Sequence, residues 1–110
     1  MTREYLHQGL AEGRWSSMTV EEQLGNIGSE VNRAIQARND AKRFDRAIVR
    51  ALELFDLTLS DSRWRKRLKE IARAREVFCD AAYGLSEYNT TLEDLNIYFF
   101  YFALAARSNR

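Results

Sequence analysis

Residues 95–106 read LNIYFFYFALAA, and this stretch decides what fold the rest of the chain must make. Every residue in it except Asn96 is apolar or aromatic. A helix that is apolar nearly all round its circumference must be covered on nearly all sides. Three partner helices from the same chain would cover part of it, so the remaining apolar surface must be covered by another molecule.

The composition limits the class of protein. The chain has 110 residues, enough for one domain with one core, and its 45% hydrophobic and 30% charged residues are typical of a globular protein. The net charge of +1 gives no bulk attraction to nucleic acid or to membranes. The absence of proline and the small number of glycines favour helices joined by short links over a strand-rich fold.

Two further observations bear on the compartment. Cys79 is the only cysteine, so an intrachain disulfide is impossible and a reducing compartment fits. The N-terminus lacks the apolar core of a signal peptide, and the 95–106 stretch is shorter than the ~20 residues that cross a bilayer. We therefore expect a soluble, cytoplasmic protein without membrane contact.

Capping signals and apolar periodicity predict four helices. Thr19 and Glu22 have the spacing of a capping box, and so do Thr90 and Glu93 further along the chain. Gly84 is placed to end the third helix. The expected helices cover residues 20–38, 41–59, 63–83 and 91–106, after a short helical arm at 1–16. With mostly tight connections, they predict one all-α domain, an antiparallel up-down-up-down four-helix bundle.

Two glycines lie inside the first predicted helix, where each costs ~1 kcal/mol relative to alanine. They are Gly25 and Gly28, and Gly28 borders the apolar stripe of that helix. We expect a neighbouring aromatic side chain or backbone to approach closely at Gly28.

The last predicted helix carries two apolar faces. One face is expected to enter the core, and large exposed apolar patches mark interfaces. We therefore expect a homo-oligomer, or contact with another protein partner, with this helix at the centre and a cyclic assembly as one option. The alternative is that the arm, with Tyr5, Leu6, Leu10 and Trp15, folds over the second face. We expect Trp15 to dock the arm onto the body of the protein, because a free indole is costly in water. That second face consists of Ile97, Phe100, Tyr101 and Leu104.

A cluster of positive charge begins the third predicted helix, where the helix dipole disfavours cations. One interpretation is a site for phosphate, nucleic acid or an acidic partner. The other, which we favour, is a solvated face balanced by Asp56 and Asp61. The members of this basic cluster are Arg63, Arg65, Lys66, Arg67 and Lys69, with Arg46 and Arg50 of the second helix as candidate additions.

Arg75 interrupts the apolar stripe of the third predicted helix, which consists of Trp64, Leu68, Ile71, Phe78, Cys79 and Ala82. Either its stem lies along the core with the head in water, or the guanidinium is buried and paired. Glu30 or an acidic residue of the second helix would be the partner. We favour a structural ion pair over an anion-binding site.

No pattern in the sequence indicates catalysis. His7 is the single histidine, and the Glu-x-x-His repeats of di-metal bundles are absent. There is no glycine-rich phosphate loop or nucleophile motif, and Cys79 is expected to be a core thiol. We expect a non-enzymatic interaction or accessory protein without cofactor or metal. RNA or DNA binding by the basic cluster is the alternative.

Two resemblances accompany these patterns. The stretches 9–15 (GLAEGRW), 22–31 (EQLGNIGSEV) and 75–80 (REVFCD) resemble small hypothetical proteins of prokaryotic genomes. Ala11-Glu12-Gly13, Ser17, Glu22 and Gly28-Ser29 are similar in order to segments of a four-helix-bundle family that includes 23S rRNA intervening-sequence proteins and retroelement accessory proteins. That resemblance implies a ring-forming bundle that binds RNA or a reverse transcriptase through basic surfaces, with no catalytic residue. The chain departs from the family in its nearly neutral charge and in the helix order around the motif.

Overall fold

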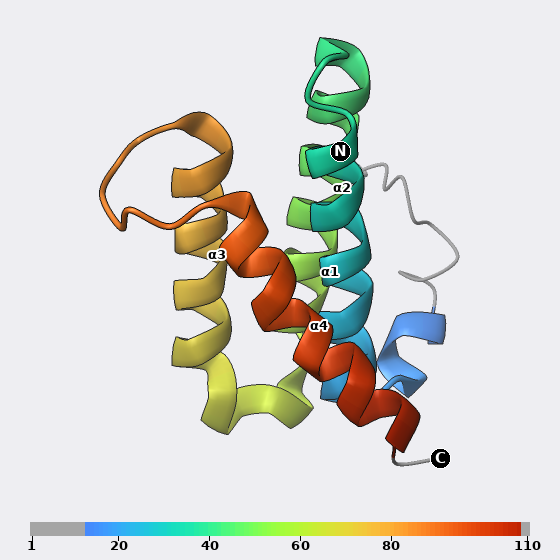
Figure 1. Ribbon diagram of the computed structural model, residues 1–110. Coiled ribbons are helices and arrows are strands. Elements are labelled where there is room, and N and C mark those ends of the chain that lie inside the picture. The colour runs from blue at the N-terminus through green and yellow to red at the C-terminus, as the bar shows by residue number, and fades with distance from the viewer. Residues whose placement is uncertain (1–12, 109–110) are drawn as a thin grey trace, which may run out of the picture.

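The computed structural model describes residues 13–108, and within that range every secondary-structure element is a helix. Four α-helices pack together, so the fold is all-α, as the sequence predicts (Figure 1). No helix of the described part is both long and apolar enough to span a bilayer. The elements are η2 (Trp15–Ser17), α1 (Val20–Gln36), α2 (Ala41–Leu59), η3 (Ser62–Arg67), α3 (Leu68–Tyr83) and α4 (Leu92–Ser108).

Most of the expected N-terminal arm, including Tyr5, Leu6, His7 and Leu10, lies outside the described residues. Its last part is described, and there Trp15 is buried against the core. The expectation that Trp15 docks onto the body of the protein is therefore confirmed.

Local capping sets the starts of α1 and α2. The Thr19 hydroxyl accepts a hydrogen bond from the Glu22 N–H at 3.1 Å, and the Glu22 carboxylate accepts one from the Thr19 N–H at 3.0 Å. The predicted capping box is therefore confirmed. Asp40 caps α2 by accepting a hydrogen bond from the Arg43 N–H at 3.2 Å. The bounds of α2 match the expected 41–59, whereas α1 ends at Gln36, short of the expected residue 38.

The third predicted helix does not start as a regular α-helix at residue 63. The 3-10 helix η3 comes first, with a kink at Trp64 (φ −101°, ψ 24°), and α3 follows from Leu68. Two contacts hold this turn: Asp61 accepts a hydrogen bond from the Arg63 N–H, and the Trp64 indole donates to the Gln23 side chain at 2.8 Å. The predicted start was wrong because the second of these contacts is tertiary.

Two other expectations about the third helix have opposite outcomes. Gly84 ends α3 in the left-handed conformation (φ +67°), which confirms the predicted cap. Leu68 was expected on the buried stripe, but it is 42% exposed. Leu68 is the first residue of α3, next to η3, and burial begins further along the helix at Ile71, Ala74 and Phe78.

The capping box of α4 lies one residue later than predicted. Thr91, not Thr90, is the cap: its hydroxyl accepts a hydrogen bond from the Asp94 N–H, and the Asp94 carboxylate accepts one from the Thr91 N–H, both at 3.1 Å. The prediction that Glu93 would reach back was wrong because α4 begins at Leu92, so Asp94 is the third helical residue. Glu93 forms an ion pair with Arg38, just after the end of α1.

Helix α4 crosses α1 obliquely and lies close against it (Figure 1). Two glycines of α1 make this approach possible. A Cβ atom built on Gly28 would lie only 2.6 Å from Phe99 Cβ, and one on Gly25 would lie 3.2 Å from Ala103 Cα. The expectation that an aromatic residue approaches closely at Gly28 is therefore confirmed.

Aromatic rings from three helices meet beneath this crossing. Phe55 of α2 packs against Phe78 of α3 and Phe99 of α4, with ring centroids 5.7 and 5.8 Å apart. All three side chains are fully buried. Aromatic pairs at these separations stabilise a core beyond their buried area. The core therefore fixes α4 relative to α2 and α3 as well as to α1.

Candidate interaction surface on helix α4

Helix α4 has one buried face and one exposed face. Leu92, Leu95 and Phe99 are buried in the core. On the opposite side, at helical spacing, Ile97 is 57%, Phe100 51%, Tyr101 65% and Leu104 39% exposed. We call these last four side chains the outer face. In Figure 1, α4 lies in front of α1 along this crossing.

Polar contacts on the α3 side hold α4 in this orientation. The Tyr98 hydroxyl donates a hydrogen bond to the Glu70 carboxylate at 3.1 Å, and Arg67 donates to the same carboxylate at 2.9 Å. Burial, together with the nearby Glu70 carboxylate, raises the pKa of Tyr98 to about 12. The Arg67 hydrogen bonds lower the pKa of Glu70. Arg67 also lies over the Phe102 ring at 5.7 Å. The start of α3 therefore contacts α4 at both Tyr98 and Phe102.

A groove lies on each flank of α4. The groove between α1 and α4 has a volume of about 290 Å³, and its lining includes Ser29, Asn96, Phe100 and Arg107. The groove between α3 and α4 has a volume of about 250 Å³ and is lined mainly by apolar atoms. The outer face therefore continues into a polar flank on the α1 side, where Phe100 belongs to both.

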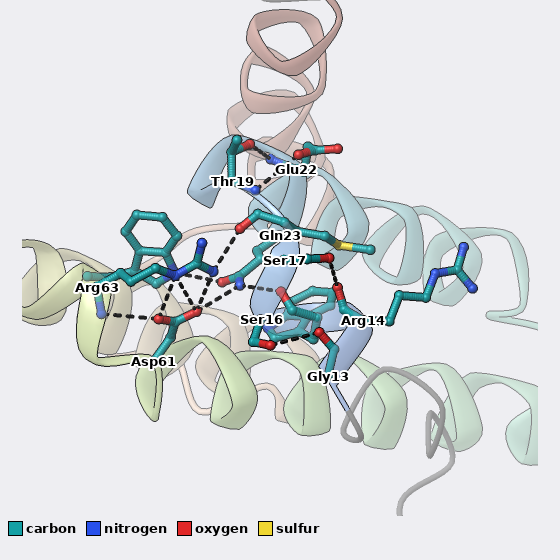
Figure 2. Close-up of polar contacts among 12 residues, drawn as sticks. Gly13, Arg14, Ser16, Ser17, Thr19, Glu22, Gln23, Asp61 and Arg63 are labelled. Carbon is teal, nitrogen blue, oxygen red and sulfur yellow. Dashed lines mark hydrogen bonds and ion pairs between the residues drawn. The ribbon is translucent and has the colours of Figure 1, made fainter.

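The structure does not bring the seven members of the basic cluster into one patch. Arg63 forms an ion pair with Asp61 at 2.7 Å (Figure 2). It also donates to the Met18 carbonyl at 2.8 Å and lies over the Trp64 ring. Its hydrogen bonds lower the pKa of Asp61 to about 2. Arg67 is engaged with Glu70, as described above.

The other members of the cluster are distributed along two elements. Arg65, Lys66 and Lys69 are exposed on η3 and the first turn of α3. Arg46 lies roughly 20 Å along α2 from the start of η3, at 1.5 Å per residue, and Arg50 about one turn nearer. A phosphate site that uses all seven cations is therefore not assembled within this chain.

The ion pair of Arg75 selects one of the two partners that the sequence left open. Arg75 Nε donates to the Asp56 carboxylate of α2 at 3.0 Å, and both side chains remain about one third exposed. Glu30 instead pairs with Arg33, one turn away on α1, at 2.6 Å. The Glu30–Arg75 pair is therefore wrong, because α3 packs beside α2 and α4 rather than against the Glu30 side of α1.

The side chain of Gln23, near the start of α1, is a buried polar group that the sequence analysis did not predict. Gln23 is fully buried, and both ends of its amide are used (Figure 2). Its Nε2 donates to the Trp15 carbonyl at 3.0 Å and to Asp61 at 3.1 Å, while its Oε1 accepts from Trp64 at 2.8 Å. Its position in the sequence could have indicated this burial, because Gln23 lies one turn after Val20 and beside Leu24, on the edge of the apolar stripe.

No known protein family, curated protein or solved structure matches this chain. Among residues 13–108, no group of three or more histidine, cysteine or acidic side chains is placed to hold a metal ion.

Proposed function

We propose that this chain is a non-enzymatic interaction or accessory protein that self-associates through the outer face of α4. We also propose that the four helices have an up-down-up-down arrangement and that the protein works in a reducing, cytoplasmic compartment. One observation carries it: four neighbouring large apolar side chains are 39–65% exposed on a helix whose other face is in the core.

The size of the outer face supports an interface. At roughly 200 Å² per large side chain, these exposures leave on the order of 400 Å² of apolar surface open. The largest apolar patch on a monomer is typically ~300–600 Å² and is often functional. A stable interface takes ~800 Å² per partner, with an apolar centre and a polar rim. The outer face would supply the centre, and Asn96, Glu93 and Arg107 would supply part of the rim.

Measurement of molecular mass tests the proposal. Sedimentation or light scattering across micromolar concentrations should show an oligomer for the wild-type chain. Replacement of Phe100 and Leu104 by serine together should give a folded monomer, because both contribute to the centre of the patch. Leu85→Ser is the matched control, since Leu85 is 59% exposed but lies in the loop before α4. A strictly monomeric wild-type chain at high micromolar concentration contradicts the proposal.

A second candidate function is RNA or DNA binding by the exposed cations Arg65, Lys66 and Lys69. The engagement of Arg63 and Arg67 with Asp61 and Glu70 reduces the charge available for phosphates. Phosphate binding falls steeply with salt. Titration of labelled structured and single-stranded RNA at two salt concentrations, with Arg65, Lys66 and Lys69 reversed to glutamate, decides this candidate.

A further inference from the structure

The outer face of α4 is symmetric along the helix. Its members, at positions 97, 100, 101 and 104, are separated by three, one and three residues, so the pattern reads the same in both directions. The midpoint lies between Phe100 and Tyr101. A surface with this symmetry matches a second copy of itself that runs in the opposite direction, which is the arrangement that a two-fold axis through the midpoint produces.

A two-fold axis at the midpoint pairs residues at equal distances on either side of it. Ile97 would then face Leu104 of the partner subunit, so a β-branched side chain meets a γ-branched one at each end. Phe100 and Tyr101 lie closest to the axis. Phe100 therefore packs beside Phe100 of the partner subunit, and Tyr101 packs beside Tyr101 of the partner subunit. All four side chains, exposed by 39–65% in the single chain, would be covered in this pairing.

The charges at the two ends of α4 distinguish the two possible directions. The first turn carries Glu93 and Asp94, and the last turn carries Arg107. Glu93 and Arg107 are 14 residues apart, close to four helical turns, so they lie on the same side of the helix. A parallel pair would place like charges together, whereas an antiparallel pair places Glu93 beside Arg107 of the partner subunit. Although Glu93 is bound by Arg38, its side chain is 51% exposed and open to a second cation.

We propose that two copies of this chain form a two-fold symmetric dimer in which the α4 helices pack antiparallel about the midpoint between Phe100 and Tyr101. The inference depends on the proposed function, because it specifies the geometry of that same surface. The occupant of the outer face is therefore the α4 helix of a second copy, held by apolar contacts at the centre and by a Glu93–Arg107 contact at each end.

Site-directed cross-linking tests the direction of packing. In a Cys79→Ser background, Ile97→Cys and Leu104→Cys chains are prepared separately and then mixed, and a short bismaleimide is added. The mixture should give several-fold more covalent dimer than either chain alone, and Phe100→Cys alone should cross-link to itself. Circular dichroism and molecular mass first establish that the Cys79→Ser chain folds and associates like the wild type.

The possible results distinguish self-association through the outer face from the antiparallel direction of packing. A wild-type monomer overturns both the proposed function and the antiparallel dimer. An oligomer in which Ile97→Cys and Leu104→Cys each cross-link to themselves is parallel, and an oligomer with a ladder of larger products is a ring. Either of these outcomes overturns the antiparallel dimer alone. An oligomer with no cross-link at these positions associates elsewhere and overturns both.

Charge reversal gives an independent test. Glu93→Arg should weaken dimerisation roughly tenfold, because each of the two symmetric contacts becomes a repulsion. Arg107→Glu in the same chain should restore it. Arg38→Ala is the matched control: it breaks the intrachain pair with Glu93 but leaves the contact between subunits, so the dissociation constant should not change. Failure of the double reversal to restore dimerisation overturns the antiparallel pairing.

Discussion

Replacement of Gly28 by alanine tests the contact that seats α4 on α1. The new methyl group would lie 2.6 Å from Phe99 Cβ and 3.6 Å from the Phe99 carbonyl carbon. Both of these atoms are fixed to a backbone, so neither can be moved by a side-chain rotation. Phe99 is fully buried, with its ring against Phe55 at 5.8 Å. The helix α4 itself must therefore shift relative to α1.

Two opposing effects set the change in the free energy of unfolding that Gly28→Ala causes. Alanine is favoured over glycine inside a helix by ~1 kcal/mol. Carbon atoms pack best at ~3.5–4.0 Å, so the contact must open by about 1 Å. Overpacking of a core costs ~1–3 kcal/mol, and this contact belongs at the upper end because a whole helix moves. The net expectation for Gly28→Ala is a loss of about 1–2 kcal/mol, which lowers Tm by roughly 4–8 °C per kcal/mol in a domain of this size.

Urea denaturation followed by circular dichroism, at one fixed protein concentration, measures this loss. Gly25→Ala is the matched control, because its methyl group would meet Ala103 at 3.2–3.3 Å and needs a shift of only a few tenths of an ångström. Its stability should stay within about 0.5 kcal/mol of the wild type or rise. If Gly28→Ala is as stable as Gly25→Ala, the tight seating of α4 on this glycine is refuted.

Three further perturbations follow from the polar contacts. Gln23→Ala removes the three hydrogen bonds of a fully buried side chain and should cost about 2–3 kcal/mol in urea denaturation, whereas Gln36→Ala, on the exposed end of α1, should stay within about 0.5 kcal/mol. The pKa of Asp61 is lowered to about 2 in the folded chain, so its contribution is complete above its unfolded pKa of about 3.9 and is lost as pH falls towards 2. Asp61→Asn should therefore lose less stability than the wild type between pH 5 and pH 2.5, and an equal loss would contradict this. Arg75→Ala should lower stability by only about 1 kcal/mol in a thermal melt, because its ion pair with Asp56 is partly open to solvent.

The features that the sequence predicts correctly are those whose physical cause is local. The Thr19–Glu22 capping box and the Gly84 cap depend on residues within one turn of the helix end, so spacing alone identifies them. The close approach at Gly28 was also predictable, since a costly glycine on a buried face requires a neighbour. Which neighbour fills the space depends on how two helices cross, and the sequence does not specify that Phe99 does so.

The features that the sequence did not predict depend on contacts between distant elements. The η3 kink requires the hydrogen bond from Trp64 to Gln23, which lies 41 residues away in the chain. The choice of Asp56 over Glu30 as the partner of Arg75 depends on which helix lies beside α3. For the basic cluster, the favoured interpretation named Asp56 and Asp61 as the balancing acids. Asp61 does pair with Arg63, but Glu70 pairs with Arg67, and Asp56 pairs with Arg75 of α3.

Burial of apolar area alone does not determine how α4 is rotated about its own axis. Because the helix is apolar nearly all round, several rotations would bury a similar area. Shape and polar contacts decide instead: the space above Gly28 accepts Phe99, and the Tyr98 hydroxyl reaches Glu70. Once these contacts are made, the outer face points away from the core as a consequence. Gly28→Ala should therefore loosen the rotation of α4 and weaken self-association as well as folding, whereas changes to the outer face should weaken association alone.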